Sequence, residues 1–446
     1  MPTLAEYHLT GEPMNLTNYS SANLSRRQAL SLGMLGGFGL TLPGILRAET
    51  QLSRTAKAKS VILLWLQGGV SHHDTFDPKP DAPAEVRGQF GVIPTKLPGV
   101  QFSDKMPLMA NILDKFALVR SVTHAEAAHE RGSMYMVEGR RPPRETGVSH
   151  SGNPMLGSIV SQQLGPREGV PAFMSTPGTD FTTKFTGPGW LPRSHRPFRG
   201  ADVGILQTGD KTTSGDALKA REDLLRQLNQ PRSGDLPGDA WDRFQTEAVD
   251  IVTSGKVAKA FDLSSESAQV KASYGIGIKS NDKLGELSLT ARRLTGAGVR
   301  FVTIGRDSWD HHDNIFPQLK SRLPVFDAAF SGLVTDLADR GRLDDTLVIY
   351  LTEYGRTPTV NPKAGRDHWP QCFSVAFAGA GIKPGQVIGS TDKTGAAVKD
   401  APLTPEQIAA TILHLVGIDP QTITHKTDGR PITVAEEAEP FRPLLG

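Results

Sequence analysis

Histidine and acidic residues gather at five places in this chain of 446 residues, and more than half of its twelve histidines lie in these clusters. The clusters are 71–74 (SHHD), 124–130 (HAEAAHE), 307–313 (DSWDHHD), 353–356 (EYGR) and 366–368 (RDH). Imidazole nitrogens together with carboxylate oxygens bind Zn²⁺, Mn²⁺ or Fe, and histidine also transfers protons near neutral pH. The clusters therefore predict a metal-binding or acid–base site.

The segments that must position these clusters have the sequence pattern of buried β-strands. Four continuous apolar runs each end at one of the clusters, and the remaining cluster comes shortly before a fifth run. The runs are 60–66, 116–122, 299–304, 346–351 and 373–378. Ligands of open α/β sheets bind beyond the carboxyl ends of the strands, so these positions favour one shared site. A single histidine pair taken alone is equally compatible with a loop or a helix cap.

Helical patterns separate the apolar runs. They cover 283–295, 319–340 and 404–416, and the last opens with Thr404 followed by Pro405, a favourable helix start. Alternating strands and helices predict an α/β fold with a mostly parallel central sheet that is flanked by helices on both faces.

Composition narrows the chemistry further. Charged residues make up 22% of the chain and hydrophobic residues 38%, which is ordinary for a globular protein. The formal net charge of +2 gives no reason to expect a nucleic-acid partner. The single cysteine, Cys372, excludes an internal disulfide and a cysteine-based zinc site.

The amino-terminal residues are typical of an export signal. Arg26 and Arg27 precede an apolar, glycine-rich run at 29–46 that contains no charge. This pattern predicts a twin-arginine signal over 1–48, with the twin-arginine export machinery as a partner. The protein would then be exported across the inner membrane to the periplasm or cell envelope. Retention of the segment as a membrane anchor is the alternative.

We predict three further parts of the chain after this signal. A linker covers 49–59, and one α/β domain covers 60–446. A segment rich in glycine, proline and arginine at about 185–238 is expected to be a surface insertion on that domain.

Several motifs resemble a known family. They are the paired arginines, Gly68-Gly69, Trp309-Asp310-His311-His312, the run 352–357 (TEYGRT) and the run 365–368 (GRDH). Together they resemble the DUF1501 family, which is placed in the alkaline phosphatase and sulfatase superfamily. The resemblance covers most of the chain after about residue 59 and implies an alkaline phosphatase-like core with metals at the carboxyl edge of the sheet.

The resemblance also implies roles for individual residues. One divalent ion or two are expected, with Zn²⁺ or Mn²⁺ as the first candidates. Asp310, His312 and His368 would stand at one metal, and Glu353 would take the place of an acidic ligand. Tyr354 occupies the position of the superfamily's histidine and serves either as packing or as a proton donor. Further candidate ligands are His72, Asp74 and Asp367.

The sequence offers several candidates for the attacking group. A helix that starts near His129 and ends in a G-R-x-P pattern places His129 at the superfamily's nucleophile position. His129 is therefore the first candidate for a nucleophile or general base, followed by His124, with Ser71, Thr123 and Ser133 as alternatives. Arg356 would either bind an anion or pair with Glu353. Cys372 lies near a different strand, which argues against a formylglycine sulfatase.

Three functions fit these expectations. The first is a metal-dependent hydrolase of phosphate or sulfate esters, including esters on a polysaccharide, that uses a metal-activated water or a histidine nucleophile. The second is a non-catalytic envelope protein that retains the fold and binds a metal or an anionic glycan. The third is a metal-dependent mutase or transferase that moves a phosphoryl group.

Overall fold

A large central sheet organises the protein, whose computed structural model describes residues 56–143, 151–176, 187–200, 250–251, 254–278, 283–426 and 428–446. The predicted export signal, most of the predicted linker and most of the predicted insertion lie outside these residues. The sheet has eight strands in the order β12-β4-β11-β8-β1-β7-β5-β6. In that order the strands cover Gln386–Ile388, Phe116–Val122, Phe373–Ala378, Thr346–Leu351, Ser60–Leu66, Phe301–Arg306, Phe173–Ser175 and Phe198–Arg199.

All neighbouring strands of this sheet pair in parallel except those that flank β11, which runs antiparallel to both β4 and β8. Four of the five predicted strands have the predicted bounds, and the run predicted at 299–304 forms β7 two residues later. The direction of β11 has a consequence for the site. Residues that precede β11 lie at the same edge of the sheet as residues that follow the parallel strands.

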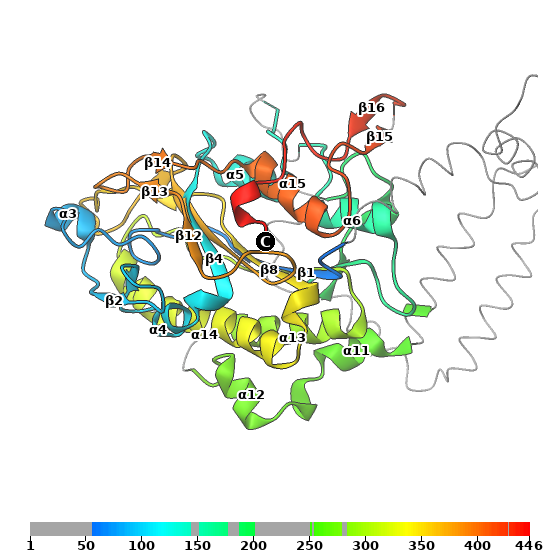
Figure 1. The fold of residues 1–446 in the computed structure, drawn as a ribbon, viewed down its shortest axis with the longest axis horizontal. Helices are drawn as coiled ribbons and strands as arrows, with labels where there is room; N and C mark the ends of the chain where they lie inside the picture. Colours follow the sequence, from blue (N-terminus) through cyan, green and yellow to red (C-terminus); the bar gives the residue numbers. More distant parts are fainter. Residues whose placement is uncertain are drawn as a thin grey trace, which may run out of the picture. The chain divides into compact units, whose positions relative to one another are not determined.

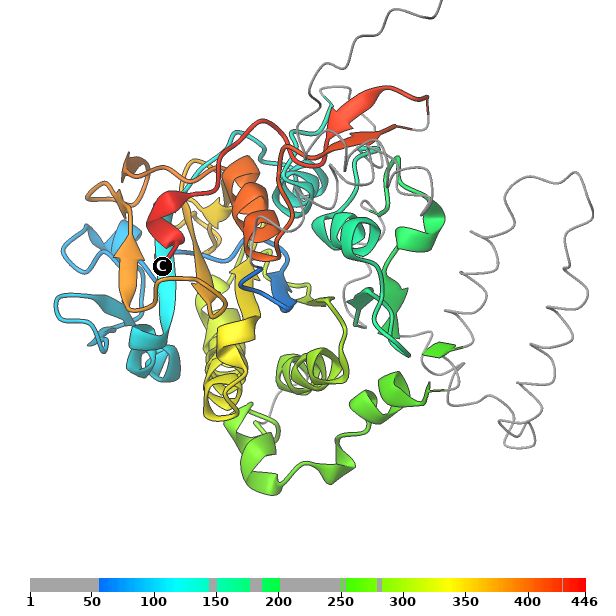
Figure 2. The same ribbon diagram turned by 45° about the vertical axis from the view of Figure 1, so that its right-hand side comes forward.

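Two layers of helices cover the sheet, and Figure 1 shows them on opposite sides. One layer contains α4, α11, α12, α13 and α14, and the other contains α5, α6 and α15, an arrangement that is also visible in Figure 2. The first layer covers Pro107–Asn111, Lys256–Phe261, Ala268–Ser273, Leu284–Ala297 and Ile315–Asp339. The second covers His129–Glu138, Leu156–Leu164 and Pro405–Leu415. This architecture confirms the predicted fold class.

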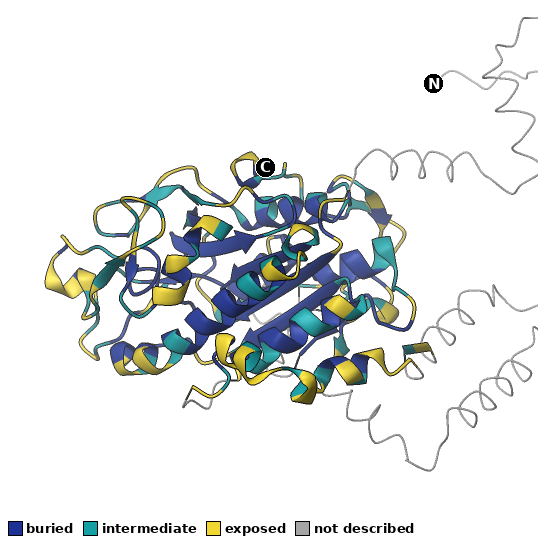
Figure 3. Ribbon diagram, turned by 60° about the horizontal axis from the view of Figure 1, so that its bottom comes forward, coloured by how far each residue is buried: buried dark blue, intermediate teal, exposed yellow. Residues whose placement is uncertain are grey.

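The central strand β1 shows how the sequence produces two cores. Ile62, Leu64 and Leu66 pack into the core beneath α13 and α14, whereas Val61, Leu63 and Trp65 pack into the core beneath α15. This alternation follows from the period of two in a β-strand. Because both faces are buried, the strand reads as a continuous apolar run, and Figure 3 shows the strands as the buried centre of the molecule.

The start of α15 at Pro405 is determined by a capping motif that can be recognised in the sequence. The Thr404 hydroxyl accepts a hydrogen bond from the Gln407 amide, and the Gln407 side chain accepts one from the Thr404 amide. This capping box satisfies two amides that would otherwise lack helical partners.

Within the described ranges, no helix is both long and apolar enough to cross a membrane.

Small elements complete the fold. α3 covers Ala84–Arg87, and four two-stranded pairs lie outside the main sheet. They are β2 with β3 (Val92–Pro94, Gln101–Ser103), β9 with β10 (Gly355–Arg356, His368–Trp369), β13 with β14 (Ser390–Thr391, Val398–Asp400) and β15 with β16 (Ile423–His425, Pro431–Thr433).

Gly68 allows two strand-end loops to touch. It follows β1 with a φ of 119°, in the region that favours glycine. A Cβ atom at this position would lie 2.3 Å from the Asp310 amide nitrogen and 2.4 Å from the Trp309 carbonyl carbon. The loop after β1 therefore packs directly on the backbone of the loop after β7.

This contact predicts that Gly68→Ala destabilises the protein more than Gly99→Ala does. Both glycines have positive φ, but a Cβ at Gly99 meets open space. We expect Gly99→Ala to cost about 1–2 kcal/mol from backbone strain and Gly68→Ala roughly 1–3 kcal/mol more from the clash. Denaturant unfolding measures both. Equal losses of unfolding free energy would contradict the proposed close approach.

Candidate active site

The carboxyl ends of β1, β4, β7 and β8 meet at one edge of the sheet, and the short pair of β9 and β10 lies there too. In that pair Arg356 lies opposite His368. Residues from four of the five predicted clusters meet at this edge. The side chains of the fifth cluster, 71–74, bond instead to backbone groups or to an arginine, as described below.

Asp310, His312 and His368 form a triangle of potential ligand atoms. Asp310 Oδ1 lies 3.0 Å from His312 Nε2 and 3.1 Å from His368 Nε2, and the two Nε2 atoms are 2.9 Å apart. Ligand atoms of His129, Asp310 and His368 also lie within 4.8 Å of one another. A tetrahedral ion with bonds of about 2.0–2.2 Å holds its ligand atoms at a similar spacing.

The far nitrogens of both imidazoles in the triangle support the same interpretation. His312 Nδ1 lies 2.6 Å from Asp367 Oδ1, and His368 Nδ1 lies 2.7 Å from the Ala127 carbonyl oxygen. Both partners only accept hydrogen bonds, so each Nδ1 carries the proton and each Nε2 presents a lone pair to the triangle. Metal-binding histidines are commonly oriented in this way. The residues present therefore fit a divalent metal.

Asp367 thus orients His312 and does not itself reach the triangle, which corrects the expectation that it is a ligand. The hydrogen bond from His312 lowers the pKa of the Asp367 carboxyl and keeps it ionised as an acceptor. Asn361 Nδ2 contacts the same carboxylate at 3.4 Å and donates to the His312 carbonyl at 2.9 Å.

Asp310 is the most heavily contacted acid of the site. Oδ2 lies 3.1 Å from His129 Nε2, while Oδ1 accepts from Arg356 Nη2 at 2.5 Å. Burial raises the pKa of this carboxyl, but the hydrogen bonds from His129 and Arg356 and the charge of Arg356 outweigh it and hold the pKa far below the usual range. Asp310 is therefore an anion at any physiological pH.

His129 begins α5 and lies between two carboxylates. Its Nδ1 is 2.8 Å from Glu353 Oε1, and its Nε2 faces Asp310. Burial alone would lower the pKa of the ring, but the bonds to Asp310 and Glu353 dominate and raise it to about 9. With a proton on each nitrogen, His129 is arranged to donate a proton, whereas a nucleophile or base would need a free lone pair.

Glu353 positions His129 through a hydrogen bond from its Nδ1 atom. Its side chain is fully buried, and Oε1 also accepts from the Gly68 amide at 2.7 Å. Thr352 Oγ1 lies 3.2 Å from Oε2. The Glu353 carboxylate therefore holds His129 in place. Its oxygens bond to His129, Gly68 and Thr352, none of which belongs to the triangle.

Tyr354 takes a larger part than the sequence indicated. Its hydroxyl lies 2.7 Å from His129 Nδ1 and 3.0 Å from His368 Nδ1. Burial, reinforced by the charge of Glu353, raises the pKa of this phenol well above its usual range, so the hydroxyl stays protonated. The ring is buried as well, so Tyr354 serves in packing and in the hydrogen-bond network together. Its position directly after Glu353 is the signal that would have identified it.

Arg356 is a structural clamp in this arrangement, not an exposed anion-binding group. The guanidinium is fully buried and donates to the carbonyl oxygens of Gly69 at 2.9 Å, Arg366 at 2.8 Å and Gly68, in addition to Asp310. Neither sequence-based alternative, an open anion site or a pair with Glu353, matches this set of partners.

Three other predicted residues have their hydrogen-bond partners outside the triangle. His72 Nε2 lies 2.9 Å from the Gly395 carbonyl oxygen, and burial lowers the pKa of the ring to about 4, so the imidazole is neutral. Asp74 accepts from Arg366 Nε at 2.8 Å in a buried ion pair. His124 uses both nitrogens on backbone groups, with Nε2 2.7 Å from the Glu353 carbonyl oxygen. Burial also lowers the pKa of His124 to about 4.

A pocket of about 550 Å³ adjoins the site at Asp367. Its lining is neutral apart from this carboxylate and combines the loop 357–362 with Trp369 and part of the loop after β13. Through Asp367, the pocket lies beside the residue that holds His312.

Comparisons with known proteins identify one family. A family model described as "Protein of unknown function (DUF1501)" matches residues 58–445. Comparison with curated proteins gives no match. The match extends over almost the whole of the described structure.

Solved structures with low sequence identity also resemble the chain. One is the lipoteichoic acid synthase LtaP from Listeria monocytogenes, with 10% identity, a TM-score of 0.37, and coverage of 88% of this chain and 83% of the other. The alkaline phosphatase of the Antarctic bacterium TAB5 has 14% identity, a TM-score of 0.35, and coverage of 75% and 95%. A sulfatase from Pseudoalteromonas sp. has 15% identity, a TM-score of 0.34, and coverage of 84% and 70%.

The buried pair of Asp74 and Arg366 predicts a purely structural effect for Asp74→Asn. Removing one partner leaves the Arg366 charge buried and unpaired, which costs roughly 3–5 kcal/mol of unfolding free energy. Metal content should stay unchanged in the folded variant. Asp428→Asn, which breaks the exposed pair with Arg430, is the control and should leave the melting temperature nearly unchanged. Loss of metal from folded Asp74→Asn protein would contradict the structural role.

Proposed function

The chain belongs to the DUF1501 family, and we propose that it is an exported, metal-dependent hydrolase of phosphate or sulfate esters. The observation that carries the proposal is the triangle of Asp310, His312 and His368 with His129 beside it. Export rests on the paired arginines and the apolar run that follows them.

Asp310, His312 and His368 would hold the ion, with Zn²⁺ and Mn²⁺ as the candidates that suit this donor set. A divalent metal bound there acts as a Lewis acid toward an ester oxygen and lowers the pKa of water toward neutrality. Among the described residues, the one group of potential ligands is His129, Asp310 and His368, which shares Asp310 and His368 with the triangle. A single shared location favours one ion over two.

The protein's own residues support proton transfer at this place. His129 holds a proton on Nε2, next to Asp310 Oδ2, and presents it at the edge of the triangle. Glu353 and the Tyr354 hydroxyl fix the ring from the other nitrogen. We therefore assign His129 the protonation of the leaving oxygen, and Glu353 and Tyr354 the positioning of His129.

Two of the three alternative side-chain nucleophiles are hydrogen-bonded to an acid or fully buried, which favours water as the attacking group. The Ser71 hydroxyl donates to Asp74 at 2.6 Å. Ser133 is fully buried within α5. The neutral pocket beside Asp367 suits the uncharged alcohol part of an ester, such as a sugar.

One observation favours the non-catalytic alternative, an envelope protein that binds a metal or an anionic glycan. The Arg356 guanidinium is buried and bonded to backbone carbonyls, so it offers no exposed contact for an ester anion at the triangle. Metal binding is compatible with both functions, and turnover separates them.

Metal content is the first test of the proposal. We expect about one divalent ion per chain in protein purified without chelators, and almost none in the variant His312→Gln/His368→Gln. Elemental analysis measures both, with His425→Gln at an exposed strand as the control for loss of a histidine. Full metal content in the double variant would remove the triangle as the metal site.

Turnover of aryl phosphates and aryl sulfates is the second test. Because a positioned proton donor contributes about 10²–10⁴ in rate, we expect His129→Ala to lower kcat by that factor while the metal content of the folded variant is retained. His425→Gln should keep the original rate. Absence of turnover in metal-loaded protein across a broad ester panel would reject the hydrolase and leave the binding protein.

A further inference from the structure

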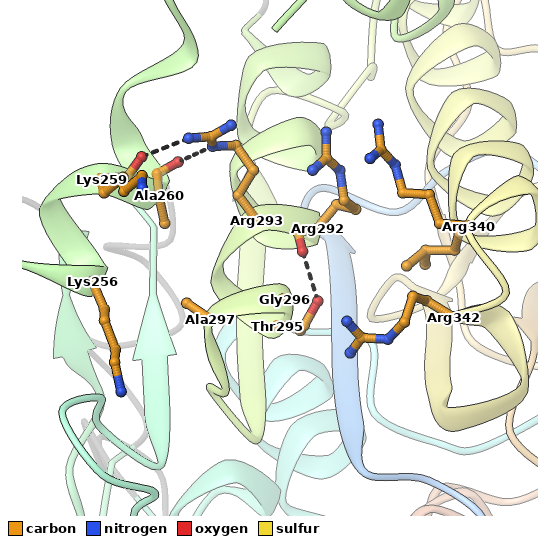
Figure 4. Close-up of a pocket in the computed structure, with 11 residues that line it drawn as sticks. Lys256, Lys259, Ala260, Arg292, Arg293, Thr295, Gly296, Ala297, Arg340 and Arg342 are labelled. Atoms are coloured by element: carbon orange, nitrogen blue, oxygen red, sulfur yellow. Dashed lines mark hydrogen bonds between the residues drawn. The ribbon is translucent and has the colours of Figure 1, made fainter. Parts of the chain in front are cut away.

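A second pocket, of about 340 Å³, lies between α11, α13 and the end of α14. We call it the basic pocket. Six cationic side chains line it around the last turn of α13 (Figure 4): Lys256, Lys259, Arg292, Arg293, Arg340 and Arg342.

The basic pocket and the triangle lie at opposite edges of the sheet. Its residues Ala297 and Arg342 each come four residues before a strand, β7 and β8, whereas Asp310 and Glu353 follow the same two strands. Each strand has six residues and is therefore about 20 Å long. One small ligand cannot reach both places.

Acidic residues neutralise only part of the positive charge around the pocket. Glu266 contacts Arg292 at 2.9 Å and also pairs with Arg293. Asp336 is shared by Arg292 and Arg340, at 3.0 and 2.6 Å. Each carboxylate therefore serves two cations.

The remaining acid, Asp345, is likewise shared, by Arg342 at 3.2 Å and by Lys59 at 3.3 Å. Lys256 and Lys259 have no ion pair with any described acid, and the Lys256 ammonium donates to the Glu168 carbonyl oxygen. Six lining cations thus face three shared carboxylates, which leaves an excess of positive charge.

The two arginines at the end of α14 keep part of their donor sets available. Arg340 and Arg342 each contact their acid through Nε, and their terminal nitrogens have no hydrogen bond to any described residue. Their side chains are 44% and 37% exposed. Figure 4 shows them on one side of the last turn of α13, with Lys256 and Lys259 on the other. Guanidinium forks of this kind bind tetrahedral oxyanions.

Stabilisation of helix ends does not account for the whole cluster. Cations near the carboxyl ends of α13 and α14 interact favourably with the helix dipole. Lys256 is the first residue of α11, where the dipole disfavours a positive charge. Gathering cations in one pocket also costs repulsion, which a bound anion relieves.

We propose that the basic pocket binds a phosphate or sulfate group. The binding site is separate from the proposed ester hydrolysis and does not depend on it. The group is either a free inorganic ion or a substituent of an anionic polymer, and the chemistry of recognition is the same for both.

Titration calorimetry at low ionic strength tests this site with sodium sulfate and sodium phosphate. The full chain is used after chelator treatment, so that a metal at the triangle cannot take up the anion. Because two guanidinium contacts are lost, we expect Arg340→Gln/Arg342→Gln to weaken anion binding by at least about tenfold. Lys96→Gln/Lys399→Gln removes the same charge from exposed sites elsewhere and should leave affinity within about twofold.

A sulfated dextran oligosaccharide titrated in parallel identifies the source of the group. Pocket-dependent binding of the inorganic ions supports a free ion as ligand, and pocket-dependent binding of the oligosaccharide alone supports a polymer substituent. Binding of neither, or an equal loss in the two double variants, overturns the proposal. Melting temperatures confirm that every variant is folded. Ester turnover by Arg340→Gln/Arg342→Gln should match the unmodified protein, so failure of either proposal can be recognised separately.

Discussion

The candidate site depends on the burial of one guanidinium group. Arg356 is fully buried and donates to the loop after β1 at Gly69, to the Arg366 carbonyl ahead of β10, and to Asp310 after β7. A buried charge is tolerated only when it is paired and hydrogen-bonded. The three loops must therefore close around Arg356, and this closure places the Asp310 carboxylate where the two imidazoles meet it.

A second set of contacts orients the groups that line the site. Asp367 and the Ala127 carbonyl hold the far nitrogens of His312 and His368, and Glu353 holds that of His129. Asp367, whose pKa is lowered, and the Ala127 carbonyl accept hydrogen bonds, so each favours a proton on the far nitrogen that it contacts. The rings are thereby oriented before any ion or substrate is bound, which reduces the cost of binding.

Sequence reasoning predicted the main strands because a strand buried on both faces forms a continuous apolar run. It could not predict the direction of β11, since such a run looks the same in either direction. Position at a strand end also did not reveal where a side chain points: His72, Asp74 and Arg356 all lie at the correct edge, but their partners are backbone carbonyls or buried ions. The grouping of Asp310, His312 and His368 came from the family motifs, because spacing along the chain contains no information about which loops meet.

The reversed direction of β11 affects when the site can exist. His368 precedes this strand, yet it meets residues that follow β4 and β7, and the bond between His129 and Glu353 joins positions 224 residues apart. Contacts of such long range form late, because chain closure has to come first. If the triangle holds a metal as proposed, a partly folded chain therefore has scattered candidate ligands and no chelating centre. The compartment in which folding is completed would also be the one that supplies the metal, and its free metal pool would decide which ion the protein carries.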